Sequence, residues 1–415
     1  MDEQTFFIRG NTYSANDDRL QAALAQIYET PERPRCMCVK GGVAMYVAKH
    51  RTFVVKRMPE TGSQHHLSCP SYASDTQQSG LGELIGEAVI EHSPESVELR
   101  VDFPLTRVLG RSRLSGEQQT AADVSVPKRR MSLRAVMHFL FEKAGMNRWT
   151  SAMEGKRNQG VLCKYLNEAA EEITTKGMRL SERLYVPEPF SEAAKIKNAE
   201  RRRSKLAFLQ SRADGTHFDM AMIVGEFKGS EATASGRRIF VKHMPDAPLL
   251  VDVKAWARIE RVYGRLFEAR DADTIYKPRV VMCALIYAKR EHTYQIDTAS
   301  FMLATEQWIP LNGIDEIDLI HALIEQKRRF VKPLQYDAKS AAVFPNALLL
   351  DAGDTPVALH VLSGFMDQKE KAAKERAIKS GDGAQWGWST DQPMPSLPAV
   401  IHRSPSASIR DACRL

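Results

Sequence analysis

The sequence lacks any apolar run long enough to cross a membrane. Its longest apolar stretches, such as residues 278–288 and 347–350, fall well short of the ~20 residues that a bilayer-spanning helix needs. The first seven residues begin acidic and are not the basic, then apolar, leader of a secretory signal. We therefore expect a cytoplasmic protein that does not use a membrane as a partner.

Recognised catalytic motifs are also missing. The sequence contains no Gly-rich phosphate loop, no nucleophile elbow and no kinase motif set. It has neither a helix-turn-helix nor an RNA-recognition signature, and we find no internal repeat. The case for catalysis from motifs alone is therefore weak.

The composition excludes a wholly disordered chain, because 43% hydrophobic and 26% charged residues are ordinary for a globular protein. The net charge of +7 over 415 residues permits a polyanionic partner without requiring one. In a reducing cytoplasm the six cysteines are expected to be metal ligands or buried thiols. Cys163 and Cys283 lie in apolar surroundings, which favours the core for both.

We expect an α+β protein of several domains. The predicted divisions are a zinc-ribbon-like β module (1–75), a strand and polar linker (76–130), a helical basic domain (131–212), a mixed α/β domain (213–330), a degenerate restriction-endonuclease-like core (331–388) and a disordered tail (389–415).

Local patterns support these divisions. Residues 43–48 and 52–56 read as a hairpin, and Ser132 is placed to cap an amphipathic helix that ends near Gly145. Further helices are predicted at 161–176, 191–212, 256–270, 314–328 and 368–379, and strands at 97–103, 218–227, 238–243, 249–253, 280–287, 347–351 and 358–362.

The most specific signal is a cluster of cysteines and histidines on either side of the hairpin. Cys36 and Cys38 precede it, and His65, His66 and Cys69 follow it. Because a hairpin returns the chain to its starting end, the two pairs should meet and supply four ligands for a structural Zn²⁺. The H-x2-C spacing favours His66 as the fourth ligand, with His65 as the alternative. Free thiols and surface histidines are the alternative, which the clustering of three of the six cysteines beside these histidines disfavours.

Positive charge is densest in two segments. The basic residues of these segments are the predicted nucleic-acid contacts: Lys128, Arg129, Arg130, Lys195, Lys197, Arg201, Arg202, Arg203 and Lys205. Such arrays bind phosphate backbones through counterion release. A solvated helix face is the alternative, since Glu192 and Glu200 offset part of the charge.

Four residues are candidates for a metal-dependent nuclease site: Asp219, Glu226, Lys228 and Asp252. Carboxylates that hold Mg²⁺ beside a lysine are the chemistry of restriction-type nucleases. Alternation along a strand, however, places Asp219 on the face opposite Glu226 and Lys228. A charged strand end at the surface is therefore the favoured interpretation.

The segment after residue 344 has the strand, turn, strand, helix order of a nuclease core without its ligands. Asn346, His360 and Leu362 occupy the positions where that motif requires Asp, Glu and Lys. An amide cannot supply the negative charge that Mg²⁺ prefers. We therefore expect this core to be degenerate.

Several motifs resemble the DUF1173 family over nearly the whole chain apart from the tail. They are the Cys36-x-Cys38 and His66-x2-Cys69 segments with the hairpin between them, and residues 133–149, 155–158, 225–228, 241–243, 307–310 and 329–336. The resemblance implies a protein of bacterial plasmids and integrative elements with a DNA-related role. It also implies that relatives carry acidic residues where this chain has Asn346 and His360.

Together these features predict a zinc-binding, nucleic-acid-binding protein without catalysis, with DNA as the expected nucleic acid. One alternative is a Mg²⁺-dependent nuclease that uses Glu226, Lys228 and Asp252. Another is an adaptor whose zinc module and Trp-containing C-terminal region bind a protein partner in conjugation or defence.

Overall fold

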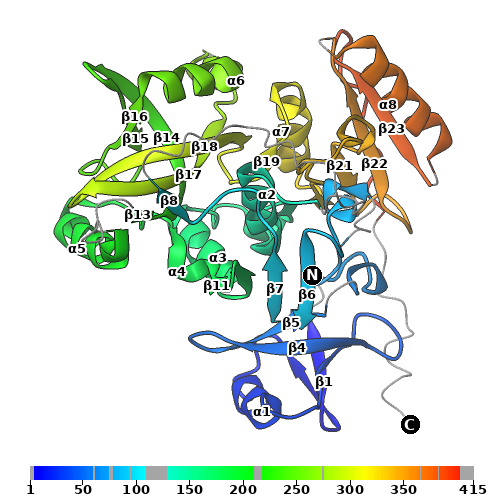
Figure 1. Ribbon diagram of the computed structural model, residues 1–415. Coiled ribbons are helices and arrows are strands. Elements are labelled where there is room, and N and C mark those ends of the chain that lie inside the picture. Colours follow the sequence, from blue (N-terminus) through cyan, green and yellow to red (C-terminus); the bar gives the residue numbers. More distant parts are fainter. Residues whose placement is uncertain are drawn as a thin grey trace, which may run out of the picture.

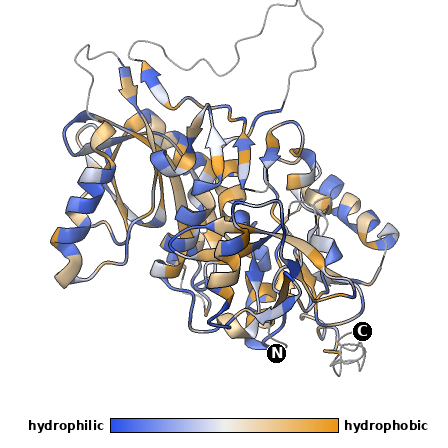
Figure 2. Cartoon of the chain, turned by 90° about the horizontal axis from the view of Figure 1, so that it is seen from below, coloured by the Kyte–Doolittle hydropathy of each residue, from blue (hydrophilic) through white to orange (hydrophobic). Residues whose placement is uncertain are grey.

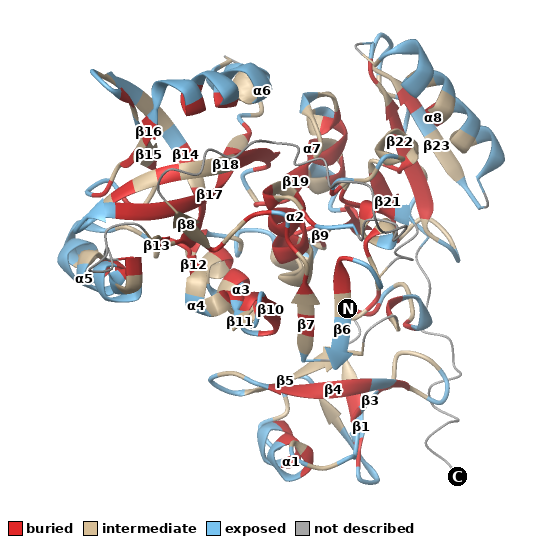
Figure 3. Cartoon of the chain, viewed as in Figure 1, coloured by how far each residue is buried: buried red, intermediate tan, exposed pale blue. Residues whose placement is uncertain are grey.

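The computed structural model describes residues 4–401 except 59–60, 74–77, 94, 109–128, 210–216, 273–274, 365 and 382. Within these ranges the protein is α+β, with five separate β-sheets (Figure 1). Buried residues concentrate in the strands and in α2, while α5, α6 and α8 expose their outer sides (Figure 3). None of the helices in these ranges is both long and apolar enough to span a bilayer.

The N-terminal module is a five-stranded antiparallel sheet beside one helix. Its elements are β1 (Thr5–Ile8), β2 (Asn11–Ser14), α1 (Leu20–Ile27), β3 (Arg35–Cys36), β4 (Val43–Lys49) and β5 (Phe53–Arg57). The strand order is β2-β1-β3-β4-β5. The predicted hairpin is confirmed as β4 and β5, in which Val47 pairs with Val55.

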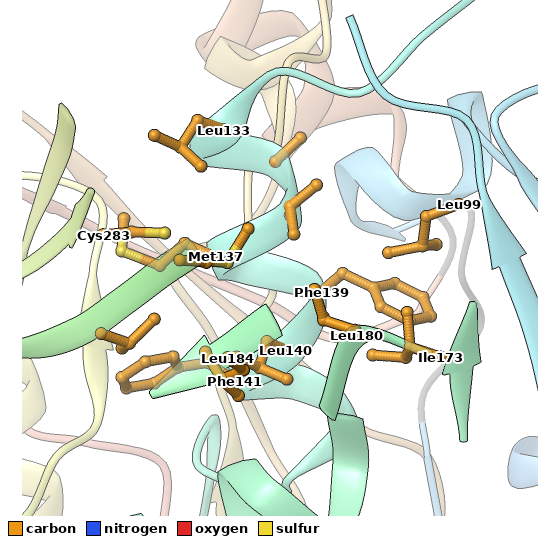
Figure 4. Close-up of a cluster of buried hydrophobic side chains, with 14 of the residues drawn as sticks. Leu99, Leu133, Met137, Phe139, Leu140, Phe141, Ile173, Leu180, Leu184 and Cys283 are labelled. Atoms are coloured by element: carbon orange, nitrogen blue, oxygen red, sulfur yellow. The ribbon is translucent and has the colours of Figure 1, made fainter. Parts of the chain in front are cut away.

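A central helical layer joins this module to the rest of the chain. Its main helices are α2 (Leu133–Lys143) and α3 (Gln159–Glu171), followed by the short α4 (Leu180–Arg183). Ser132 caps α2 as predicted, because its side chain accepts a hydrogen bond from the amide of Ala135. Residues 135–141 are all buried, so α2 lies inside the core and is not the surface helix that its spacing predicted (Figure 4).

Smaller sheets surround this layer. One contains β6 (Val89–Ser93), β7 (Ser96–Leu99), β10 (Ile173–Thr175) and β11 (Met178–Arg179), and β8 (Thr106–Val108) pairs with β13 (His217–Asp219). The pairing of β7 with β10 joins strands on both sides of the predicted boundary at residue 130. The basic helix α5 (Lys195–Lys205) follows.

The largest sheet closes on itself. It contains β12 (Leu184–Tyr185), β14 (Ala221–Thr233), β15 (Gly236–Val241), β16 (Leu249–Asp252), β17 (Arg279–Arg290), β18 (Thr293–Ala304) and β19 (Pro310–Leu311). β14 pairs with both β15 and β17, and the pairings β15–β16, β16–β18 and β18–β17 complete a ring. We call the five strands of this ring, β14 to β18, the barrel. Helix α6 (Val253–Asp271) connects its third and fourth strands in chain order.

The C-terminal sheet combines distant parts of the chain. Its order is β23-β22-β21-β20-β9, with β9 (Arg148–Trp149), β20 (Phe330–Val331), β21 (Ala347–Leu349), β22 (Val357–Leu362) and β23 (Gln385–Ser389). Helices α7 (Ile317–Glu325) and α8 (Gln368–Ser380) accompany these strands. Hydrophobic residues line the interior strands, and the outer helices carry hydrophilic residues (Figure 2).

The prediction of a disordered tail from residue 389 is corrected for residues 389–401. Met394 and Leu397 pack against the hydrophobic core, and the carbonyl of Pro398 accepts a hydrogen bond from Arg328. The amide of Ile401 donates to the carbonyl of Asp351. Isolated apolar residues and backbone groups hold this segment, so it has no periodic pattern to detect; residues 402–415 lie outside the described ranges.

Candidate metal centre and charged surfaces

Four potential ligands meet beside the N-terminal sheet. Cys36 lies on β3, Cys38 in the turn that follows, and His65 and Cys69 in the segment after β5. One ligand atom from each residue lies within 4.8 Å of all the others. Cys36, His65 and Cys69 are buried, so the cluster is largely closed to water.

The spacing of these atoms suits a tetrahedral ion. The Sγ atoms of Cys36 and Cys69 are 3.6 Å apart, and Nδ1 of His65 lies 3.3 Å from Sγ of Cys38 and 3.7 Å from Sγ of Cys69. Zn–S bonds of about 2.3 Å place the corners of a tetrahedron roughly 3.7 Å apart. Three sulfurs and one imidazole are a zinc donor set, so the cluster could bind a metal such as zinc.

Neighbouring polar groups orient the sulfurs. Nε2 of Gln4 lies 3.4 Å from Sγ of Cys36 and 3.7 Å from Sγ of Cys69, and the amide of Ser71 donates to Sγ of Cys69 at 3.3 Å. Hydrogen bonds from Cys38 and Cys69 lower the pKa of the Cys36 thiol, and hydrogen bonds with Cys36 raise the pKa of the Cys38 and Cys69 thiols. Donors around a cysteine sulfur stabilise the thiolate form that binds metal.

A glycine turn allows the chain to bend at the first pair of cysteines. Gly41 and Gly42 both have positive φ, at 82° and 66°. A Cβ at Gly42 would lie 3.0 Å from Sδ of Met37 and 3.3 Å from the carbonyl oxygen of Cys36. The tight bend expected from the two glycines is therefore present.

The choice between the histidines is corrected. His65 is the one brought to the sulfurs, whereas Nδ1 of His66, the favoured candidate, lies 2.7 Å from Oγ of Ser68. The amide of Cys69 donates to the carbonyl of His66, which closes a turn between these two residues. This turn separates the side chain of His66 from the sulfurs, a local effect that residue spacing does not reveal.

The four nuclease candidates are not brought together. Asp219 pairs with Thr106 on β8, and Asp252 pairs with Gly236 at the far end of β15 from Glu226. The length of β15, about 17 Å at roughly 3.3 Å per residue, separates Glu226 from Asp252. One metal ion cannot contact both carboxylates.

Each candidate carboxylate has a local partner. Oε1 of Glu226 lies 3.1 Å from Nζ of Lys242, and Oε2 lies 2.6 Å from Nη1 of Arg279. Asp252 caps α6 by accepting from the amide of Ala255 at 2.8 Å. Lys228 is exposed at the surface. These contacts suit a structural role for Glu226 and Asp252.

Only part of the predicted basic surface is available to a partner. Arg202 is buried and paired with Asp246, and Arg129 lies 3.0 Å from Glu83. Lys128 lies outside the described residues. The exposed members are Arg129, Arg130 and, on α5, Lys195, Lys197, Arg201, Arg203 and Lys205.

Sequence reasoning missed a second set of basic residues on the barrel and α6. Arg238 is exposed on β15, and half-buried Phe240 follows two positions later on the same outer face. On α6 the exposed cations Lys254, Arg258, Arg261 and Arg265 recur at intervals of four, three and four, which places them on one stripe. That interval is visible in the sequence, where Glu260 is the one acidic residue between Lys254 and Arg265.

The degenerate-core positions belong to a buried polar network. The side chain of Asn346 donates to Glu316 and accepts from Nζ of Lys374, both at 2.7 Å. Glu316 also pairs with fully buried Lys332 at 3.0 Å. Burial lowers the pKa of His360 to about 4, so this imidazole is neutral at pH 7. Asn346 acts as both donor and acceptor here, which a carboxylate could not do.

Comparisons with known proteins give one match. None of the curated proteins and none of the solved structures compared with the chain matches it. A family described as "Protein of unknown function (DUF1173)" matches residues 6–391, a range that includes the Cys3His cluster and the barrel. The chain therefore belongs to the DUF1173 family.

Proposed function

We propose that this protein binds nucleic acid through its barrel. The observation that carries the proposal is the closed order of the five barrel strands. The first strand, β14, pairs with the second, β15, and the fourth, β17, and the third, β16, runs parallel to the fifth, β18. A helix joins the third and fourth strands. This is the order of the OB-fold, a five-stranded barrel that binds oligonucleotides and oligosaccharides.

A bulge in the first strand supports this comparison. The pairing register between β14 and β15 shifts between Phe227 and Gly229. A bulge or glycine in a long strand increases its bend, which allows one strand to take part in both halves of a small barrel. β14 does this, since it pairs with β15 along one part and β17 along another.

The outer face of β15 favours nucleic acid over other ligands. In the OB-fold the second and third strands form the ligand face, and here the second strand is β15. Arg238 and Phe240 share its outer side, and exposed Lys289 and Arg290 lie at the end of β17. Cations beside an aromatic ring suit a phosphate backbone with stacked bases. Single-stranded DNA is the form we propose.

We also propose that the Cys3His cluster holds a structural Zn²⁺. Four protein ligands leave no open position for substrate, so the ion would stabilise the module and take no part in a reaction. Elemental analysis of the purified protein should give about one zinc per chain, and Cys36→Ser should abolish it. The nuclease alternative has no support in the separated positions of Glu226 and Asp252.

Binding of a labelled single-stranded oligonucleotide, followed by fluorescence anisotropy, tests the main proposal. Phe240→Ala should weaken binding by about 1–3 kcal/mol, the usual value of one stacked base. Arg238→Gln should lower the slope of log K against log salt by about 0.7. Lys369→Gln, which removes an exposed charge from α8, is the control and should change neither. Salt-insensitive binding, or equal affinity in all variants, would contradict the proposal.

A further inference from the structure

A pocket of about 460 Å³ lies beyond the end of β15, where five separate segments of the chain meet. Its lining includes Arg157, Gln159, Gly160, Lys242, Arg279 and Trp308. None of the described residues that line it is acidic. Its volume is within the ~300–1,000 Å³ usual for small-molecule sites.

The pocket has an excess of positive charge. Arg157 donates to the carbonyls of Gly145 at 3.1 Å and Met146 at 2.9 Å, which are neutral acceptors and leave its charge uncompensated. Lys242 and Arg279 share a single carboxylate, that of Glu226. Three cations therefore face one anion. Burial lowers the pKa of Arg157 to about 10, so it remains charged at neutral pH.

The N-terminus of α3 adds two backbone donors. Asn158 caps this helix by accepting from the amide of Val161 at 3.1 Å. The amides of Gln159 and Gly160 make no hydrogen bond within the described ranges. Free amides at a helix N-terminus favour an anion, both as donors and through the helix dipole.

A buried side chain gives independent evidence for a ligand. Gln159 is 7% exposed, and its Nε2 donates to the carbonyl of Pro187 at 2.6 Å. Its Oε1 is buried and has no partner within the described part of the chain. An unsatisfied buried acceptor is costly, and this one belongs to a residue of the pocket lining.

The pocket also gathers segments that carry the family resemblance. Residues 155–158, 241–243 and 307–310 all contribute to its lining. Two of the lining residues, His243 and Trp308, have φ of 68° and 63°. Bulky residues rarely adopt this left-handed conformation, which persists only where the surroundings impose it.

We propose that this pocket binds the phosphate group of a small phosphate ester such as a nucleotide. Lys242, Arg279, Arg157 and the two free amides supply the positive charge and the donors for the phosphate oxygens. The phosphate could come from a free nucleotide or from the end of a nucleic-acid strand, and the chemistry recognised is the same.

Calorimetric titration of the full chain with inorganic phosphate, at constant ionic strength in chloride, tests the site. Saturable binding at up to about 10 mM phosphate is expected. Lys242→Gln should weaken it about tenfold, because a charge-assisted hydrogen bond is lost. Lys242 is 42% exposed, so its loss should not prevent folding, and thermal unfolding of the variant checks this. Lys369→Gln should bind phosphate as the parent protein does.

Further ligands distinguish a free nucleotide from the end of a nucleic-acid strand as the source of the phosphate. Adenosine 5′-monophosphate binding more tightly than adenosine, with the difference lost in Lys242→Gln, identifies a free nucleotide. An oligonucleotide that gains affinity from a 5′-phosphate only in the parent protein identifies a strand end. No saturable phosphate binding, or equal binding by the parent and Lys242→Gln, overturns the proposal. The first probe is phosphate alone, so the phosphate titration still tests this pocket if the barrel does not bind nucleic acid.

Discussion

The N-terminal module and the barrel differ in what holds them together. The buried apolar cluster of the module has ten residues, and two of these are the candidate ligands Cys36 and Cys69. In the barrel, every residue from Val280 to Ala288 on β17 is buried. Its residues alternate between a core that includes α6 and the core around α2. Small units cannot bury enough apolar surface to fold alone, so they use metals or disulfides. The module is therefore expected to depend on its ion, and the barrel is not.

Loss of the metal should have the largest effect on folding. If the module stayed folded without its ion, the contrast between the module and the barrel would fail. Cys36→Ser should unfold the module and leave the barrel intact, because structural zinc contributes about 10–16 kcal/mol in small metal-dependent domains. Hydrogen exchange measured by mass spectrometry should show lost protection in β4 and β5 and unchanged protection in β17. Cys163→Ser, at a thiol outside the cluster, is the control. Full protection of β4 after chelation would contradict the expected dependence.

Removal of a buried charge should be the next largest effect, at a pair outside both the module and the barrel. Lys332 is fully buried and paired with Glu316, so Glu316→Ala leaves an unpaired buried ammonium. Breaking such a pair costs about 3–5 kcal/mol. Urea unfolding should show this loss. The exposed pair of Lys327 with Glu154 is the matched control, and Glu154→Ala should cost at most about 1 kcal/mol.

Acid should destabilise the central layer through His138. Burial lowers the pKa of His138 to about 3 from an ordinary value of 6.5, and its Nδ1 accepts from the amide of Tyr336 at 3.0 Å. The unfolded chain binds the proton first, so stability is full above pH 6.5 and falls as the pH drops toward 3. Between pH 6.5 and 4.5 the loss should be about 2 kcal/mol.

Denaturation at these two pH values, compared between the parent protein and His138→Asn, measures this contribution. The asparagine side chain can accept the same hydrogen bond and does not titrate in this range. The variant should therefore lose less stability than the parent on acidification. An identical loss in both proteins would show that other groups are responsible.

Local patterns in the sequence predicted the elements whose contacts are short in range. The cap at Ser132, the β4–β5 hairpin and the helix α6 follow from spacing and capping, and three of the four clustered ligands follow from the hairpin. Such features depend on neighbouring residues, which a single sequence displays directly.

Features that depend on distant pairing were not predicted. The strand β18 was missed because it begins with Thr293 and polar neighbours, although it closes the barrel by pairing with β17 and β16. The burial of residues 135–141 of α2 arises because strands far apart in sequence pack against this helix. Nothing in the local spacing of Lys242 and Arg279 indicates that both meet Glu226.

The smallest expected effect concerns the choice between the two histidines. Residue spacing favoured His66, whereas the cluster contains His65. His66→Ala should leave the zinc content and the stability of the module nearly unchanged, because the side chain of His66 contacts Ser68 and is not one of the four clustered ligands. His65→Ala should lose zinc, as Cys36→Ser does, because it removes the only nitrogen ligand of the cluster. Elemental analysis of the two variants side by side measures the difference. Zinc lost from His66→Ala and kept in His65→Ala would mean that the turn after β5 rearranges when metal binds, and that residue spacing predicted the ligand better than the packing of the turn.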